Sequence, residues 1–220
     1  KSAGHTLDKV YVKHDQASFW YHTPGGQARI RELAMARGAT DKLRHIGSLA
    51  PTLREAGALG GPFRDWRVDE KAGSVWTDRR MVPGVALSDC GPSIRESHLQ
   101  RVCETLHRLH ALGAALDWPV AGLTQICEEN VSRRRDVAAA YWWEAWREVV
   151  STVDRRAAGH GLLMHGDCTA SNLLVGDDIV LIDWEWSRRV NFAGYDILKL
   201  LWFDDEDPRC LRLCCHVLPV

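Results

Sequence analysis

Two short motifs decide how this chain is interpreted: HGDCTASN at residues 165–172 and LIDWE at residues 181–185. They place Asp167, Asn172 and Asp183 close together, with only apolar residues and one turn after the Asn. An isolated Asp in a loop is most often a turn or capping residue. Three polar side chains at these spacings, joined by a short apolar hairpin, instead favour a functional site.

The segment between the motifs predicts an antiparallel hairpin. The runs LLV and IVLID are β-prone and are separated by GDD. A turn centred between Asp177 and Asp178 would set Asn172 opposite Asp183, where ladder partners have Cα atoms roughly 4.5–5.5 Å apart. An amide oxygen and a carboxylate would then meet at the open end of the hairpin. Such oxygen ligands suit Mg²⁺, which typically takes one or two carboxylates together with substrate phosphates and water.

The two motifs resemble the catalytic core of the aminoglycoside phosphotransferase and choline kinase-like family, a branch of the protein-kinase-like fold. Protein kinases carry H-R-D-x-x-x-x-N and then D-F-G, with the same five-residue step from Asp to Asn. Here Gly166 replaces the Arg, and Trp184 and Glu185 follow the second Asp. The resemblance implies that Asp167 orients the acceptor hydroxyl or accepts its proton, while Asn172 and Asp183 hold Mg²⁺ on the phosphates of ATP or GTP.

The resemblance extends toward the N-terminus with less specific motifs. Lys13 in VYVKH matches the strand lysine that contacts the α- and β-phosphates, and Glu32 in RELAMAR matches its helix partner. RRMVPG at 79–84 is similar to the segment between the lobes whose backbone meets adenine. The residues expected there are Arg80, Met81 and Val82.

Local patterns give a coarse order of elements. KVYVKH at 9–14 predicts a strand, ARIRELAMARG at 28–38 predicts a helix, and residues 63–81 predict a β-hairpin. Helices are expected over 96–113, 136–153 and about 195–203. With the resemblance, this order implies an α+β, protein-kinase-like bilobal fold: a small, incomplete β-rich N-lobe over 1–82 and a mainly helical C-lobe over 83–220.

The N-lobe is expected to be incomplete because only twelve residues precede Lys13. Two strands and a phosphate-covering loop would normally come before the lysine, and Gly4 alone makes no glycine-rich loop. The chain begins at Lys1 and has 37 residues after Asp183. A fragment or a shortened gene product is therefore expected, with uncertain activity.

Composition limits the partners and the compartment. The formal net charge is −1 and gives no general attraction to nucleic acid. Seven cysteines without metal-ligand spacing favour a reducing cytoplasm, and no apolar run approaches the roughly 18 residues of a transmembrane helix. The expected partners are a nucleotide and a small-molecule acceptor with a hydroxyl group.

The acceptor is left open among an aminoglycoside, a choline-like molecule and a sugar. Glu185, Asp204 and Asp205 are candidate contacts for a cationic acceptor, although an acidic run such as DDED at 204–207 is usually a solvated surface. Two other functions remain possible from the sequence. One is a catalytically silent nucleotide-binding or interaction module; the other is a metal-dependent hydrolase using His165, Asp167 and Asp183.

Overall fold

The computed structural model describes residues 4–54, 63, 66–71, 74–134, 137–157, 161–192 and 194–203. By internal packing, the chain divides into two compact units. The first unit contains residues 1–95 and 171–185, and the second contains residues 96–170 and 186–220. The lobes predicted from the sequence, residues 1–82 and 83–220, are continuous in sequence, whereas each of these two units combines two separate segments. The predicted lobe boundary therefore stays a prediction.

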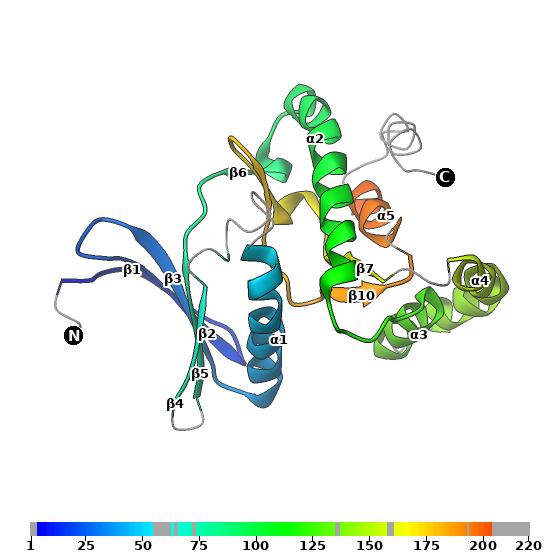
Figure 1. Ribbon diagram of the computed structural model, residues 1–220, viewed down its shortest axis with the longest axis horizontal. Coiled ribbons are helices and arrows are strands. Elements are labelled where there is room, and N and C mark those ends of the chain that lie inside the picture. Colours follow the sequence, from blue (N-terminus) through cyan, green and yellow to red (C-terminus); the bar gives the residue numbers. More distant parts are fainter. Residues whose placement is uncertain are drawn as a thin grey trace. The chain divides into compact units, whose positions relative to one another are not determined.

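The first unit is built on an antiparallel sheet of five strands in the order β1-β2-β3-β5-β4 (Figure 1). The strands are β1 (Thr6–Val12), β2 (Gln16–His22), β3 (Ala28–Ala34), β4 (Arg67–Lys71) and β5 (Ser74–Arg80). The predicted hairpin within residues 63–81 is confirmed, since β4 and β5 pair from Lys71 and Ser74 outward.

Residues 28–34 of the segment predicted as a helix over 28–38 form strand β3 instead, so the prediction was wrong there; only residues 37 and 38 are helical, at the start of α1. Ile30, Leu33 and Ala34 fit helical spacing, but a short apolar pattern also fits a strand. In the structure β3 lies between β2 and β5 and pairs with both, so its backbone hydrogen bonds are satisfied in the sheet. Two strands therefore precede β3, whereas β1 alone precedes Lys13, so the incompleteness of the N-lobe stays a prediction.

Helix α1 (Arg37–Arg54) follows β3 directly and covers one face of the sheet. Its buried side recurs at three- and four-residue steps, as expected for an amphipathic helix. A tight cluster joins Ala39 and Leu43 of α1 to Ala34 of β3 and Val75 of β5. Burial of this apolar stripe fixes the helix on the sheet, and so fixes the backbone of Lys42, which is next to the buried Leu43.

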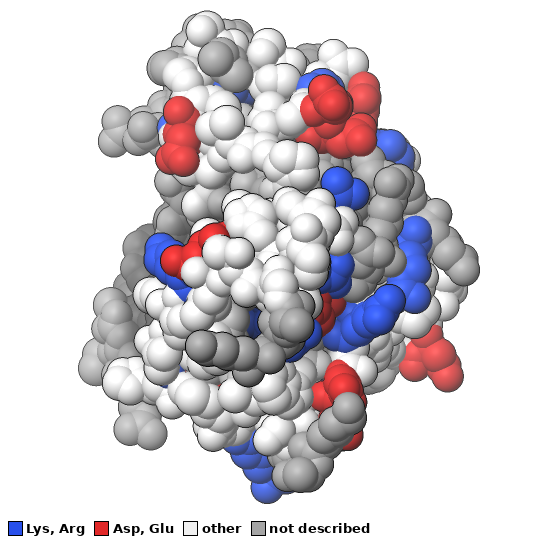
Figure 2. All heavy atoms as spheres, turned by 90° about the vertical axis from the view of Figure 1, so that its left-hand side faces the viewer, with Lys and Arg blue, Asp and Glu red and all other residues white. Residues whose placement is uncertain are grey.

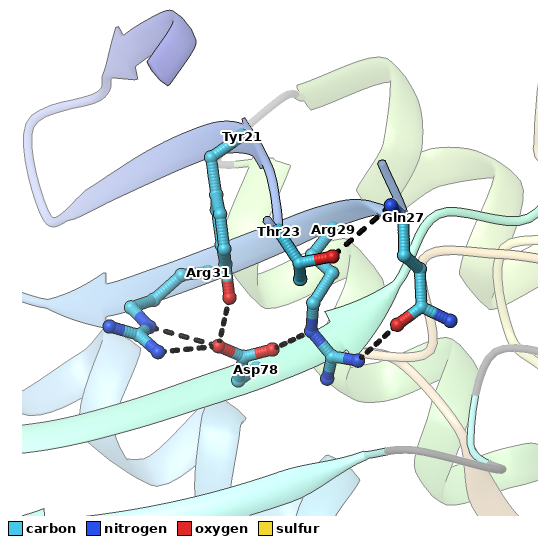
Figure 3. Close-up of polar contacts among 6 residues, drawn as sticks. All are labelled: Tyr21, Thr23, Gln27, Arg29, Arg31 and Asp78. Atoms are coloured by element: carbon cyan, nitrogen blue, oxygen red, sulfur yellow. Dashed lines mark hydrogen bonds and ion pairs between the residues drawn. The ribbon is translucent and has the colours of Figure 1, made fainter. Parts of the chain in front are cut away.

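The other face of the sheet carries a polar network centred on Asp78 of β5 (Figure 3). Its carboxylate accepts hydrogen bonds from the Tyr21 hydroxyl at 2.6 Å, from Arg29 Nε at 2.5 Å and from Arg31 Nη2 at 2.7 Å. Burial alone would raise the pKa of Asp78, but these bonds outweigh it and hold the pKa below its usual value. Figure 2 shows this face, where Lys and Arg atoms lie beside Asp and Glu atoms. The network ties β2, β3 and β5 together.

The predicted hairpin between the two motifs is present, but its register differs by one residue. Strands β8 (Leu173–Val175) and β9 (Ile179–Leu181) pair Val175 with Ile179, and β6 (Val85–Ala86) adds a third strand. The turn has three residues, closed by a hydrogen bond from Gly176 N to Asp178 O, so its centre is Asp177. Asn172 therefore faces Ile182 across the hairpin rather than Asp183, with Ile182 N donating to Asn172 O at 3.0 Å.

The second unit is mainly helical. Most of α2 (Pro92–Ala111) lies in it, and α3 (Leu123–Arg134), α4 (Val137–Arg156) and α5 (Gly194–Phe203) follow, with the antiparallel pair β7 (Leu162–Met164) and β10 (Arg188–Val190). Short 3₁₀ turns in the described part of the chain include η2 (Leu87–Asp89) in the first unit, η3 (Leu112–Ala115) in the second and η4 (Ala170–Asn172) where the chain passes from the second unit to the first. The predicted helices over 96–113, 136–153 and 195–203 are confirmed within a few residues.

Within the described residues, no helix combines the length and the apolar character needed to cross a membrane.

Candidate functional site

The first unit contains a cavity of about 410 Å³, within the size range of small-ligand pockets. Its aromatic wall includes Tyr11 of β1, Trp20 of β2, Trp66 and Trp184. Its charged and amide groups come from the β1–β2 hairpin, from β3 and β5, and from the open end of the β8–β9 hairpin: Lys9, Lys13, Gln16, Glu32, Arg79, Asn172, Asp183 and Glu185. The pocket thus combines flat apolar surface with a polar side that contains both signs of charge.

Asn172 and Asp183 both line this pocket, although they are not direct ladder partners. Asp183 is exposed and has a φ of 64°, a left-handed conformation that Asp tolerates better than most residues. This conformation follows directly after β9 and turns the chain at the end of the hairpin. An amide oxygen and a carboxylate on one wall are a donor set that Mg²⁺ accepts when phosphates complete its shell. In the described part of the chain, no three His, Cys, Asp or Glu side chains gather into a metal-binding group.

Lys13 lines the pocket, but it lies in the turn between β1 and β2 and not on a strand. Its backbone N–H donates to Gln16 O at 2.8 Å, which closes the tight connection. The expected strand over 9–14 ends at Val12 because the chain reverses there. Lys13 therefore lines the pocket from the turn of the β1–β2 hairpin. Contact with phosphates stays a prediction for this residue.

Glu32 also lines the pocket, but it lies on β3 and not on the helix that the sequence reading assigned to it. Its carboxylate accepts hydrogen bonds from Gln16 Nε2 at 3.1 Å and from Thr77 Oγ1 at 3.2 Å. Arg79 Nε lies 3.8 Å from the same carboxylate. With a side chain only 15% exposed, Glu32 is held by neighbours on β2 and β5.

Helix α1 contributes a cation that the sequence reading did not single out. Lys42 Nζ lies 2.8 Å from Glu185 Oε2, and the two side chains are 36% and 24% exposed. The hydrogen bond to Glu185 raises the pKa of Lys42, and the nearby carboxylates of Asp15 and Asp183 add to this shift. Glu185 is thus engaged with α1 in this structure. Its expected contact with a cationic acceptor stays a prediction.

The segment expected to meet adenine follows β5 without regular structure. Met81 N donates to Ala28 O at 3.0 Å, which extends the pairing of β5 with β3. Arg79 lines the pocket, whereas Arg80 is exposed and Met81 is 41% exposed. Adenine contacts at Arg80, Met81 and Val82 stay predictions.

The second unit holds the loop that contains Asp167. Asp196 of α5 is fully buried and accepts hydrogen bonds from His165 N at 2.8 Å and Gly166 N at 2.9 Å. Lys199 of α5 donates to the Asp167 carboxylate and, at 3.2 Å, to Gly166 O. Helix α5 therefore fixes both the backbone of this loop and the partly exposed carboxylate of Asp167.

Gly166 is required by the geometry of the same loop. Its φ is 82°, and a Cβ atom at this position would lie 2.2 Å from Trp186 O. Since a side chain has neither the space nor the backbone conformation it needs, only glycine fits. This is a physical reason for Gly where protein kinases carry Arg.

Asp204 and Asp205 lie outside the described residues. Lys42, Asp196 and Lys199 were not among the predicted site residues. A usable signal existed for the last two: GYDILKLLWF is an otherwise apolar helix, and its charged positions require a partner. Lys42 gave no such signal, because a Lys on an amphipathic helix is normally solvated.

The family model described as "Phosphotransferase enzyme family" matches residues 16–213. This range includes the pocket strands β2, β3 and β5, both motifs and helix α5. No curated protein sequence matches the chain.

Solved structures show the same fold at low sequence identity. A macrolide 2′-phosphotransferase type I has a TM-score of 0.71 at 16% identity and covers 97% of this chain and 77% of its own. The GDP and kanamycin complex of APH(2″)-IIia has a TM-score of 0.66 at 14% identity, with 96% and 76% covered. The aminoglycoside phosphotransferase APH(3″)-Id from Streptomyces rimosus, in complex with ADP and streptomycin, has a TM-score of 0.65 at 16% identity, with 99% and 86% covered. The predicted α+β, protein-kinase-like fold is therefore confirmed.

Proposed function

Because the chain belongs to the phosphotransferase enzyme family, we propose that it transfers the γ-phosphate of ATP or GTP to a hydroxyl group of a small molecule. The observation that carries this proposal is the pocket of the first unit. Asn172 and Asp183 share it with Lys13 and with aromatic side chains such as Trp20. Flat apolar surface suits a purine base, while the oxygen ligands and the cation suit a metal-bound triphosphate.

Asn172 and Asp183 are the residues that would hold Mg²⁺. When bound, the metal neutralises charge on the phosphate oxygens and orients them for in-line transfer. Lys13 adds a positive charge from the β1–β2 turn. These groups position a substrate and balance its charge, which is most of what phosphoryl transfer requires from a protein.

Asp167 is proposed to orient the acceptor hydroxyl and to accept its proton. Its side chain is 25% exposed, so it can meet a substrate, and its contacts with α5 restrict its position. A positioned carboxylate of this kind needs no covalent intermediate on the protein. Asp167 therefore acts on the acceptor, and Asn172 and Asp183 act on the donor.

The acceptor class is proposed from the relatives. Similar structures are complexes with kanamycin, streptomycin and hygromycin B, and others are macrolide phosphotransferases. Aminoglycosides are cationic, so an acidic acceptor side, for which Asp204 and Asp205 are the remaining candidates, would favour them. A choline-like molecule or a neutral sugar remains in the panel of acceptors to be tested.

A reducing cytoplasm remains the expected compartment. Cys90 and Cys127, two of the cysteines within the described residues, are free thiols. Free thiols are typical of proteins that stay in reducing surroundings.

A catalytically silent nucleotide-binding module is a second candidate, and one observation favours it. In protein kinases the phosphate-contacting lysine is on strand β3. Here β3 reads ARIRELA, and its pocket-lining residues are Ile30 and Glu32. Loss of that lysine could abolish transfer while nucleotide binding persists.

A combined binding and transfer experiment tests the proposal. The protein is titrated with Mg²⁺ and ATP or GTP in a thermal shift assay, and is then incubated with labelled nucleotide and aminoglycosides, macrolides, choline, amino acids or sugars. Ligand binding to the native state should raise the melting temperature, and at least one acceptor should become labelled. Binding without labelling of any acceptor would favour the silent module.

A matched variant controls for folding. Asp178→Asn makes the same chemical change as Asp183→Asn on the same hairpin, but Asp178 is an exposed turn residue outside the pocket. It should behave as wild type in both assays. No melting shift of the wild-type protein with either nucleotide would contradict the proposal.

A further inference from the structure

We infer that Lys42 of α1, held by Glu185, is the cation that contacts the nucleotide phosphates in this chain. It would take the part that the β3 lysine plays in protein kinases, but from helix α1 and with Glu185, which follows β9, as its ion-pair partner. There the lysine is on the strand and its glutamate on the helix. Here the helix carries the lysine. The inference rests on the proposed function, because it concerns how the same pocket binds a nucleotide.

The strand position is occupied by a carboxylate that is already engaged. Glu32 is the acidic residue of β3, and its two oxygens accept from Gln16 and Thr77. Arg29 and Arg31, the cations of β3, bind Asp78 on the opposite face of the sheet. Strand β3 therefore offers no ammonium or guanidinium group to the pocket. A triphosphate must find its positive partners elsewhere.

Lys42 is in the right place to supply one. Its ammonium lies 2.8 Å from Glu185, and Glu185 lines the pocket together with Asn172 and Asp183. Only one residue separates Glu185 from Asp183 in the sequence. Lys42 itself is not a lining residue, but its ammonium adjoins the pocket through Glu185, next to the oxygen ligands, where phosphate charge would be greatest.

The other cations at the pocket are less suited to this task. Lys9 Nζ lies 5.3 Å from the centre of the Trp20 ring, which favours contact with the aromatic wall. Arg79 is only 18% exposed, lies beside Glu32 and stacks over Trp66. Lys13 is exposed on a turn. Lys42 differs because a buried helix face anchors its backbone and a carboxylate fixes its ammonium.

The Glu185 carboxylate preorganises the Lys42 side chain. A lysine side chain loses considerable rotamer entropy when it is fixed; because the ion pair already restricts Lys42 before the nucleotide binds, less entropy is lost on binding. A strongly hydrated ammonium with three donors can bond Glu185 and a phosphate oxygen together. Glu185 is accordingly a positioning residue, acting through Lys42.

The test compares Lys42→Met with Arg44→Met by titration calorimetry, using nonhydrolysable ATP and GTP analogues with Mg²⁺. Arg44 is a matched control, since it is on the same helix and pairs with Glu70 at 2.8 Å away from the pocket. Loss of one charged hydrogen bond should weaken triphosphate binding of Lys42→Met by about 10- to 100-fold. Arg44→Met should bind as wild type does.

Adenosine and guanosine, measured by displacement, separate a phosphate contact from damage to the pocket. Lys42→Met should bind the nucleosides as wild type does, and Lys42→Arg should recover part of the triphosphate affinity. Equal losses for nucleoside and triphosphate would overturn the inference, as would an unchanged triphosphate affinity. If the wild-type protein binds triphosphate, but Lys13→Met and not Lys42→Met weakens that binding, the proposed function stands and the role inferred for Lys42 is wrong. If the wild-type protein binds neither triphosphate, the proposed function and the inference are both wrong.

Discussion

Lys199 donates a hydrogen bond from its ammonium to the carboxylate of Asp167, across 32 positions of sequence. The two side chains are 18% and 25% exposed, so water screens this pair only in part. The ammonium also bonds Gly166 O at 3.2 Å. Helix α5 thus determines where the proposed catalytic carboxylate points, although nothing in the HGD motif itself reveals this.

Lys199→Met should reduce turnover by about 10- to 100-fold, because a small displacement of a positioned catalytic group has effects of this size. Lys199→Arg should recover part of the loss. Affinity for the magnesium nucleotide should stay unchanged, since Lys199 is not a lining residue of the nucleotide pocket. Steady-state kinetics with calorimetry checks this; a fall in nucleotide affinity equal to the fall in turnover would contradict it.

Asp167→Asn should lower turnover more strongly than Lys199→Met. A positioned acid or base typically contributes about 10²- to 10⁴-fold, and an amide cannot accept the hydroxyl proton. Nucleotide binding should remain close to wild type, because Asp167 is assigned to the acceptor. Both kcat and nucleotide affinity should be measured on one preparation. The prediction requires kcat to fall while nucleotide affinity stays close to wild type.

Asp183→Asn should damage binding and transfer together. The carboxylate is the charged member of the proposed Mg²⁺ pair, and removing a charged ligand should weaken magnesium-dependent nucleotide binding by about 10- to 100-fold. Binding measured without Mg²⁺ should change little. If Asp183→Asn leaves magnesium-dependent binding intact while Asp167→Asn abolishes it, the assigned roles are exchanged and a metal-dependent hydrolase has to be considered again.

The fold class and the presence of Asn172 and Asp183 in one pocket could be predicted because their signals are local, whereas their binding of Mg²⁺ stays a prediction. A motif of eight residues, a short hairpin and a motif of five residues lie within one stretch of chain. The predicted hairpin register was wrong by one residue because GDD forms a three-residue turn, closed by a hydrogen bond from Gly176 N to Asp178 O. Turn length sets register, and the sequence alone did not distinguish the two turns.

The N-terminal strands were harder to predict because their identity depends on partners distant in sequence. ARIRELA has spacing that fits a helix, and only pairing with both β2 and β5 makes it a strand. The helix expected over 28–38 put Glu32 on the wrong element, and Lys13, expected on a strand over 9–14, lies one residue beyond the end of β1. The run QASFWYH at 16–22, rich in aromatic residues, was the signal for the missed strand.

Asp78→Asn should destabilise the protein by about 1–3 kcal/mol at neutral pH, the usual loss for hydrogen bonds to a charged group. The folded-state pKa of Asp78 lies below its unfolded value. Its contribution is therefore fully present above the unfolded pKa of about 3.9 and is lost as pH falls through the lower folded pKa. Urea unfolding of both proteins should show the largest difference near pH 7 and a shrinking difference below about pH 4.

Glu70→Gln is the matched control for this prediction. Glu70 lies on β4 of the same sheet and pairs with Arg44, but the pair is exposed. Surface ion pairs contribute little to stability, so this variant should unfold nearly as wild type does. A difference between Asp78→Asn and wild type that stays constant from pH 7 to pH 3 would show that the charge on Asp78 is not responsible.

Asp196→Ala should affect both stability and turnover, because the buried Asp196 carboxylate holds the backbone of the loop that precedes Asp167. Two backbone N–H groups, those of His165 and Gly166, would lose their acceptor, at about 1–3 kcal/mol for each group left unsatisfied.

Asp154→Ala is an informative comparison. Asp154 also accepts from two backbone N–H groups, at Leu123 (2.6 Å) and Thr124 (2.8 Å), but these begin helix α3. Both variants should unfold at lower urea concentration than wild type. Measured at a temperature where each is folded, only Asp196→Ala should lose turnover, since α3 carries no residue assigned to the reaction. Equal turnover in the two variants would show that the loop keeps its shape without Asp196.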